Sequence, residues 1–338
     1  MNLNEIEHFS KVSLRRRYAI RGSINYQVNQ IFLKSEIFTP GLSKHAAKVE
    51  ARTEGAKTWA DIGKSINIYS YSTAQSYKDI WHQFGHFVKA ELRVRDLENI
   101  KGEHVQIYLK SRIADGIKYA TFQKEAAALS KFDSAINGFA EKTESGRHYD
   151  FRSSMKDVRQ EAAQTLERFQ ETRSYVDPGQ LIKNIDNKSY QIAACIQHEG
   201  GARLYESSLI HSNQLEGMGK DLAGREVGRV RLDPADTKGG KGRTILVSLE
   251  TYRRLEIHIA EHGEFRISNS NGYRDALKIA AEQSNQKYTG SHGLRWNYAQ
   301  ERFSELQKAG YTHEQCLSQT SWNMGHERAD ITLHYLQP

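Results

Sequence analysis

Apolar side chains between about residues 66 and 170 recur at steps of three and four positions, which is the spacing of one face of an α-helix. Ser72 or Thr73 can cap the first helix of this region. The stripe that follows consists of Tyr77, Ile80, Trp81, Phe84, Phe87 and Val88. Similar stripes predict helices near 105–113, 121–139 and 153–169. We expect these aromatic rings to pack into a helical core rather than to form a base-stacking surface.

From about residue 173 the pattern becomes mixed. Two strand-like runs, 226–232 and 243–249, flank the glycine-rich segment 236–242, which predicts a turn between two strands. Helical patterns cover most of the remainder: 179–198, 203–211, 250–261, 272–284, 292–308, 312–322 and a short helix that ends at Tyr335. The sequence therefore predicts a mainly α fold with a small β-sheet (α+β).

The length of 338 residues fits two domains better than one. We expect a basic N-terminal extension over 1–65, a helical domain over 66–172 and a mixed domain over 173–338. Lys and Arg outnumber Asp and Glu by 48 to 41, which gives a formal charge of +7. This excess favours a polyanionic partner, because clustered Lys and Arg release counterions from a phosphate backbone. Many proteins of similar charge bind no nucleic acid, so the charge does not identify the partner.

The chain has two cysteines, Cys195 and Cys316, which lie far apart in the sequence. Neither a disulfide framework nor a CxxC zinc pair is present, which favours a reducing, cytoplasmic setting. The N-terminus has no apolar core typical of a secretory signal. No apolar run approaches the roughly 20 residues that a membrane-spanning helix needs, so we expect no membrane association.

Candidate chemistry begins at Arg203, which follows two glycines and precedes Glu206 by three positions. This spacing is typical of an arginine at the start of a helix with an i,i+3 ion pair. An arginine can also bind two oxygens of one phosphate, with Glu206 holding it in place. Lys238 lies between the two predicted strands. A lysine in a glycine turn is ordinarily solvated, but a flexible hairpin can bring it to a DNA groove to protonate a leaving oxygen.

Further candidates lie near the end of the sequence. His292 and Arg295 are one helical turn apart, so both side chains can point the same way. His326 follows a glycine, and Tyr335 comes nine positions later. Each of these features is common in proteins and has an ordinary structural explanation when taken alone.

The histidines also raise the question of a zinc site formed by His292, His313, His326 and His334. The HExxH signature is absent, and Cys316 has no close Cys or His ligand pair. We therefore expect no metal and no other cofactor.

Taken together, these residues form a set that can attack a phosphodiester without a metal. Two arginines can neutralise the charge of the transition state, which is usually the largest catalytic contribution. A histidine and a lysine can move protons to and from the attacking and leaving oxygens. A tyrosine can supply the nucleophile, and its phosphate ester conserves the bond energy, so ATP is not needed.

The segment from Ser291 to Gln337, with HxxR followed by a GH and a TxxY, resembles the C-terminal signature of the tyrosine recombinases of the phage integrase type. GGARLYESSLI resembles the box that holds the first arginine of the family, and TKGGKGRTILVSL resembles its lysine hairpin. The helical stretch STAQSYKDIWHQFGHFVKAE resembles the core-binding domain. The resemblance covers roughly residues 66–338 and implies a helical core-binding domain followed by a mixed catalytic domain.

The resemblance also implies a role for each candidate. Tyr335 attacks the scissile phosphate and forms a 3′-phosphotyrosyl link, while Arg203 and Arg295 hold the non-bridging oxygens. His292 accepts the tyrosine proton, His326 binds the phosphate, and Lys238 donates a proton to the 5′-oxygen. Glu206 is supporting, and Lys241 and Arg243 contact DNA, with Lys241 replacing Lys238 if the hairpin register is shifted.

The implied partner is duplex DNA carrying recombination sites, bound by a homotetramer, with accessory directionality or host factors. Only three residues follow Tyr335, whereas many relatives continue with a segment that docks on the neighbouring subunit. We therefore expect either that the subunits are coupled differently, for example through residues 1–65, or that a partner supplies the regulation. Two alternatives remain open: a DNA-binding or architectural protein on the same scaffold with weak or no cleavage, and a topoisomerase or resolvase that uses the same tyrosine chemistry.

Overall fold

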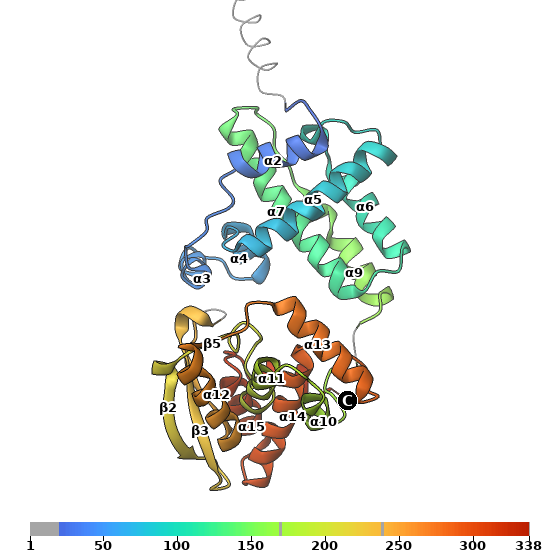
Figure 1. The fold of residues 1–338 in the computed structure, drawn as a ribbon. Coiled ribbons are helices and arrows are strands. Elements are labelled where there is room, and N and C mark those ends of the chain that lie inside the picture. Colours follow the sequence, from blue (N-terminus) through green and yellow to red (C-terminus); the bar gives the residue numbers. More distant parts are fainter. Residues whose placement is uncertain (1–19, 169–170, 238–239, 338) are drawn as a thin grey trace, which may run out of the picture. The chain divides into compact units, whose positions relative to one another are not determined.

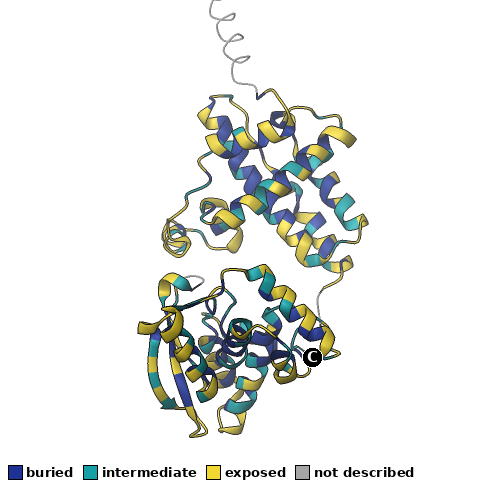
Figure 2. Ribbon diagram, viewed as in Figure 1, coloured by how far each residue is buried: buried dark blue, intermediate teal, exposed yellow. Residues whose placement is uncertain are grey.

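The computed structural model describes residues 20–168, 171–237 and 240–337, and the chain divides into two compact units, Met1–Phe169 and Gln170–Pro338 (Figure 1). In each unit the buried residues lie on the inner sides of the elements and the exposed residues on the outside (Figure 2). Within the described ranges, no helix is long and apolar enough to cross a membrane.

The described part of the first unit is helical, with one isolated bridge between Phe38 and Ile68. Its central helices carry the predicted stripes, and Trp81, Phe84 and Phe132 are completely buried. The indole Nε1 of Trp81 donates to the Ala128 carbonyl at 2.8 Å. Its elements are α2 (Ile24–Lys34), α3 (Lys44–Thr53), α4 (Trp59–Ser65), α5 (Tyr71–Glu91), η1 (Leu97–Asn99), α6 (Gly102–Ala114), α7 (Tyr119–Lys142), α8 (Phe151–Ser154) and α9 (Lys156–Thr165).

Two local expectations for this unit need correction. The cap of α5 is Ser70, whose side chain accepts from the Thr73 amide, rather than Ser72 or Thr73. Residues 1–65 were expected to form a separate extension, but α2 packs against α5 and α7 in the same core. The approach is close, because a Cβ at Gly85 would lie 2.6 Å from Cγ2 of Ile24. The expected basic extension includes three consecutive arginines at positions 15–17, which lie outside the described residues.

The second unit combines helices with two small antiparallel sheets, one of order β2-β3-β4 and one pairing β1 with β5. Its strands are β1 (Leu209–His211), β2 (Leu215–Lys220), β3 (Glu226–Leu232), β4 (Arg243–Ser248) and β5 (Glu264–Arg266). Its helices are α10 (Pro178–Lys183), α11 (Lys188–Gly200), α12 (Leu249–His262), α13 (Ser270–Gln283), α14 (His292–Lys308), α15 (His313–Asn323) and α16 (Asp330–Tyr335), with short η2 (Ser212–Gln214) and η3 (Pro234–Asp236) turns.

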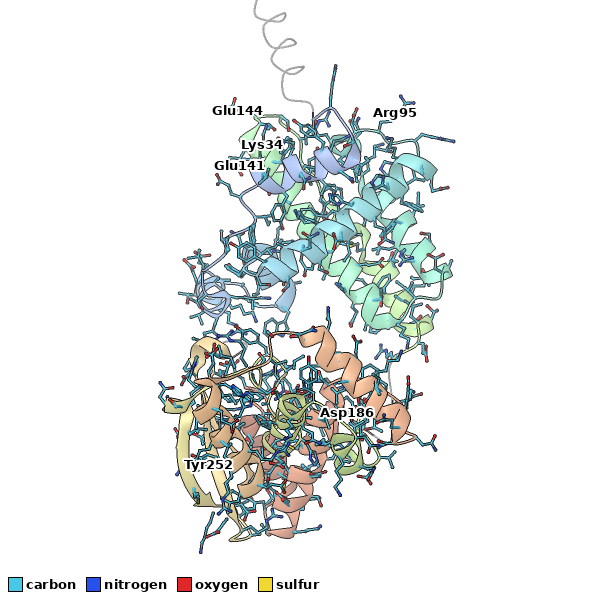
Figure 3. The ribbon with its side chains drawn as sticks, in the orientation of Figure 1. Lys34, Arg95, Glu141, Glu144, Asp186 and Tyr252 are labelled. Carbon is cyan, nitrogen blue, oxygen red and sulfur yellow. The ribbon has the colours of Figure 1, made fainter. Side chains whose placement is uncertain are left out.

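Helix α12 packs on the three-stranded sheet through Tyr252 (Figure 3). The Tyr252 ring fills the space where a Cβ at Gly228 would lie, and its hydroxyl accepts from the Gly217 amide at 3.0 Å. The predicted strands correspond to β3 and β4. The predicted helix over 203–211 is wrong: the chain turns after α11 and then enters β1. The helical pattern over 179–198 corresponds to two helices, α10 and α11.

Candidate active site

Three segments of the second unit bring the side chains of Tyr335, His292 and His326 together. Tyr335 ends α16, His292 begins α14, and His326 lies between α15 and α16. The Tyr335 hydroxyl is 3.2 Å from Nε2 of His292 and 3.5 Å from Nε2 of His326. The tyrosine side chain is largely buried, with 5% of its surface exposed. The tyrosine hydroxyl therefore lies within hydrogen-bonding distance of two imidazole nitrogens, and that of His292 is the nearer.

Arg295 lies one turn after His292 on α14 and is completely buried. Its Nη1 donates to the Gly201 carbonyl, its Nη2 donates to the Met324 carbonyl at 2.5 Å, and Nη2 is 3.0 Å from Nε2 of His326. The guanidinium thus joins the end of α11 to the segment that carries His326. Gly201 adopts a left-handed conformation with φ 61°, which favours glycine.

Arg203 and Arg243 share one buried carboxylate, that of Glu206. Nη1 of Arg203 lies 2.7 Å from Oε1 of Glu206, and the Arg203 amide donates to Oε2 at 2.8 Å. Nη2 of Arg243 also lies 2.7 Å from Oε2. The i,i+3 pair of Arg203 and Glu206 was predicted, but it forms in a turn and not at the start of a helix.

The site shifts several proton affinities. Burial, and then the charge of Arg295, lowers the pKa of His292 to about 4 and that of His326 to about 3. The charge of Arg203 also contributes to both shifts. Burial opposes ionisation of Glu206, but hydrogen bonding and charge from Arg243 and Arg203 outweigh it and lower its pKa to about 2. At neutral pH the site therefore holds two neutral imidazoles and an ionised carboxylate.

The remaining predicted residues belong to the hairpin. Lys238 lies outside the described residues, so its role stays a prediction. Nζ of Lys241 lies 2.9 Å from Oε1 of Glu327, next to His326, and both side chains are substantially exposed. The side chain of Arg243 is only 9% exposed and is bonded inside the protein, which argues against the direct DNA contact expected for it.

Three further residues support the site and were not predicted. Nε2 of Gln300 donates to the Tyr335 carbonyl at 3.0 Å, and the Trp296 ring lies 5.3 Å from the Tyr335 ring. The charge of Arg173 contributes to the low pKa of His292. Trp296 and Gln300 follow HxxR on the same helix, but no motif marks them. Among the described residues, no group of three or more His, Cys, Asp or Glu side chains could hold a metal ion.

Comparison with known proteins places the fold among known ones. The family model "Phage integrase, N-terminal" matches residues 57–137, whereas no curated protein sequence matches the chain. The structure is similar to that of the XerH site-specific recombinase in a post-cleavage complex with palindromic difH substrate, with a TM-score of 0.60 and 15% identity over 94% of this chain and 93% of that chain. It is also similar to a lambda integrase bound as a dimer to a COC′ core site, with a TM-score of 0.50 and 13% identity over 86% of this chain and 75% of that chain.

Residues 57–137 of the first unit thus match the N-terminal domain of phage integrases, and the chain as a whole shares the fold of the XerH recombinase and the lambda integrase. The resemblance inferred from the sequence motifs, and the mainly α fold with small sheets, are confirmed at this level.

Proposed function

We propose that this protein is a site-specific DNA recombinase or integrase that breaks and rejoins duplex DNA through Tyr335. The observation that carries the proposal is the 3.2 Å distance between the Tyr335 hydroxyl and Nε2 of a neutral His292, beside the buried Arg295. A phenol next to a neutral imidazole can pass on its proton as it attacks, and a buried cation favours the charge that develops on phosphate.

In the proposed cleavage step, the Tyr335 oxygen forms a bond to the scissile phosphorus, and the bond from phosphorus to the 5′-oxygen breaks. The tyrosine proton passes to His292, and the departing 5′-oxygen takes a proton from Lys238 to leave as a hydroxyl. The products are a 3′-phosphotyrosyl ester and a free 5′-hydroxyl. Attack of a 5′-hydroxyl from another strand reverses the step and completes the exchange, so the reaction consumes no ATP.

Arg203 and Arg295 are assigned to the non-bridging oxygens of the phosphate, and His326 to a hydrogen bond with it. Glu206 supports Arg203 through the contacts at 2.7 and 2.8 Å. The proposed substrate is a pair of recombination sites held by a homotetramer. The XerH and lambda integrase structures contain DNA sites of those proteins, which supports DNA as the partner here.

The test is covalent trapping. The protein is incubated without Mg²⁺ with nicked duplexes made from the DNA that flanks its own gene, and adducts are resolved on denaturing gels. We expect an adduct with the wild type and with Tyr311→Phe, a tyrosine in the turn after α14, and none with Tyr335→Phe. Sequencing of the trapped DNA then identifies the site.

The other outcomes would point elsewhere. Tight binding with no adduct on nicked duplexes would favour a DNA-binding protein on this scaffold. Relaxed circles or hairpin ends in place of recombinants would favour a topoisomerase or a resolvase. An adduct that survives Tyr335→Phe would show that another residue is the nucleophile.

A further inference from the structure

Arg243 occupies a junction between the hairpin and the candidate site. It is the first residue of β4, just after the glycine-rich segment, and its side chain is almost fully buried. Its Nη2 contacts Oε2 of Glu206 at 2.7 Å, and its Nε donates to the Asn323 carbonyl at 2.9 Å. One guanidinium therefore joins two segments that lie 37 positions before it and 80 positions after it.

The first contact acts on Arg203. The side chain of Glu206 is completely buried, and its carboxylate also accepts hydrogen bonds from the amide and Nη1 of Arg203. A buried carboxylate that accepts from two arginines holds both in a narrow range of orientations, because each contact is a charge-assisted hydrogen bond. Without Arg243, Glu206 would lose the partner that contributes most to its low pKa and would hold Arg203 less firmly.

The second contact acts on His326. Asn323 is the last residue of α15, and the chain continues through Met324 and Gly325 to His326. Gly325 has φ 71°, and a Cβ there would lie 2.8 Å from Nη1 of Arg243. The guanidinium thus lies against the turn that precedes His326. Only a residue without a side chain fits at position 325 with Arg243 in this place.

We propose that Arg243 is a positioning residue, which orients Arg203 through Glu206 and orients His326 through the Asn323 carbonyl. This deepens the proposed function and rests on it. Arg243 touches neither Tyr335 nor its imidazole partners in the contacts described above. Its substitution is therefore expected to slow cleavage without weakening DNA binding, which is the reverse of what a residue that contacts DNA would show.

The first test needs no DNA. Hydrogen exchange of the free full-length protein is compared for the wild type, Arg243→Met, Arg243→Lys and the control Arg231→Met. Arg231 is an arginine of the same sheet that lies 2.7 Å from Asp233 and is 40% exposed. We expect the amides of Met324, Gly325 and His326, which donate to Thr320, Trp322 and Ser321, to exchange at least about tenfold faster in Arg243→Met and at the wild-type rate in the control.

The second test uses the trapped site in nicked form, as a phosphodiester and as a methylphosphonate at the scissile position. The methylphosphonate is neutral, so its cleavage needs less stabilisation of negative charge by Arg203. We expect Arg243→Met to slow adduct formation at least about tenfold on the phosphodiester, with DNA affinity within about threefold of the wild type, and to lose much of this penalty on the methylphosphonate. Arg243→Lys keeps the positive charge, but a single ammonium group cannot reach both the Glu206 carboxylate and the Asn323 carbonyl as the guanidinium does. This variant should therefore recover only part of the cleavage rate.

The outcomes separate the two proposals. Unchanged exchange at Met324–His326 in both Arg243 variants would overturn the positioning role, whatever the activity. A penalty that is equal on both substrates, or a loss of DNA affinity that accounts for the slower cleavage, would also overturn it. If the wild type forms no adduct, the proposed function fails, and the exchange experiment still decides whether Arg243 orders the His326 segment. If Arg243→Met does not fold, Arg243→Lys provides the same comparisons.

Discussion

The Tyr335 hydroxyl and Nε2 of His292 lie 3.2 Å apart although 43 positions separate them in the chain. Helix α16 supplies the tyrosine and the first turn of α14 supplies the histidine, and the Gln300 contact to the Tyr335 carbonyl ties the two helices together. Because His292 has a pKa of about 4, it is neutral at pH 7 and able to accept a proton.

Replacing His292 by Gln should slow adduct formation by about 10²–10⁴-fold at pH 7, the usual contribution of a general base. In the wild type, His292 stays neutral from about pH 5.5 to 8, so its titration should not change kcat/KM for cleavage over this range. The value of kcat/KM should fall at lower pH as His292 protonates near pH 4. Single-turnover cleavage of the trapped site, followed from about pH 4 to 8 for the wild type and at pH 7 for the variant, measures both effects. A wild-type rate that falls from pH 7.5 to 6 would contradict the low pKa.

His326→Gln should make the protein less sensitive to acid. The folded-state pKa of His326 is lowered to about 3, so between about pH 3 and 6.5 the unfolded state binds more protons than the folded state. Wild-type stability should therefore fall as the pH drops through this window, by at most about 1.4 kcal/mol per pH unit from this group, an upper bound because the imidazole is partly open to solvent. Urea unfolding of the full chain at pH 5 and 6.5 should show a smaller difference in the variant. An equal difference in both proteins would rule out this contribution.

Gly325→Ala should lower the free energy of unfolding more than Gly310→Ala does. Both glycines have positive φ, 71° and 87°, but a Cβ at Gly310 meets nothing within 4 Å, whereas one at Gly325 meets the Arg243 guanidinium. Backbone strain alone should destabilise Gly310→Ala by about 1 kcal/mol, and the clash should add about 1–3 kcal/mol at Gly325. Urea unfolding measures the two costs, and equal values would mean that the Arg243 side chain moves aside freely.

Gln300→Leu should slow cleavage about tenfold while DNA affinity stays unchanged, because the Tyr335 backbone loses the donor that holds it at 3.0 Å. The exposed Gln307 on the same helix provides the control, and Gln307→Leu should cleave at the wild-type rate. Adduct formation under single-turnover conditions and a filter-binding isotherm measure the two quantities. Equal rates for both variants would show that Gln300 does not position the tyrosine.

Gly85→Ala should destabilise the protein by about 1–3 kcal/mol, because its Cβ would lie 2.6 Å from Cγ2 of Ile24 and would force α2 away from α5. Gly63, in α4, meets nothing within 4 Å, so Gly63→Ala should stabilise by about 0.5–1 kcal/mol through helix propensity. Urea unfolding of the full chain compares them. If Gly85→Ala were as stable as the wild type, α2 would not be part of the helical core.

Local periodicity determined much of what was predicted. The stripe that contains Trp81 and Phe84 places one face of α5 in the core, since side chains three and four apart lie on one side of a helix. His292 and Arg295 share the first turn of α14 for the same reason. The two strand-like runs became β3 and β4, whereas Leu215–Lys220, with glycines at alternate positions, carried no strand signal and became β2 through pairing with β3.

Only the tertiary structure decided which charged groups, distant in the sequence, form ion pairs with one another. The residues after Arg203 have helical spacing, and the sequence therefore predicts a helix there. In the structure α11 ends at Gly200, and Gly201 turns the chain. Glu206 can then contact Arg243, which lies 37 positions later. The resemblance implies a DNA contact for Arg243, but the fold buries its side chain against Glu206 and Asn323. Propensity and periodicity are properties of neighbouring residues, so they determine elements, whereas a buried carboxylate finds its partners only when those elements pack.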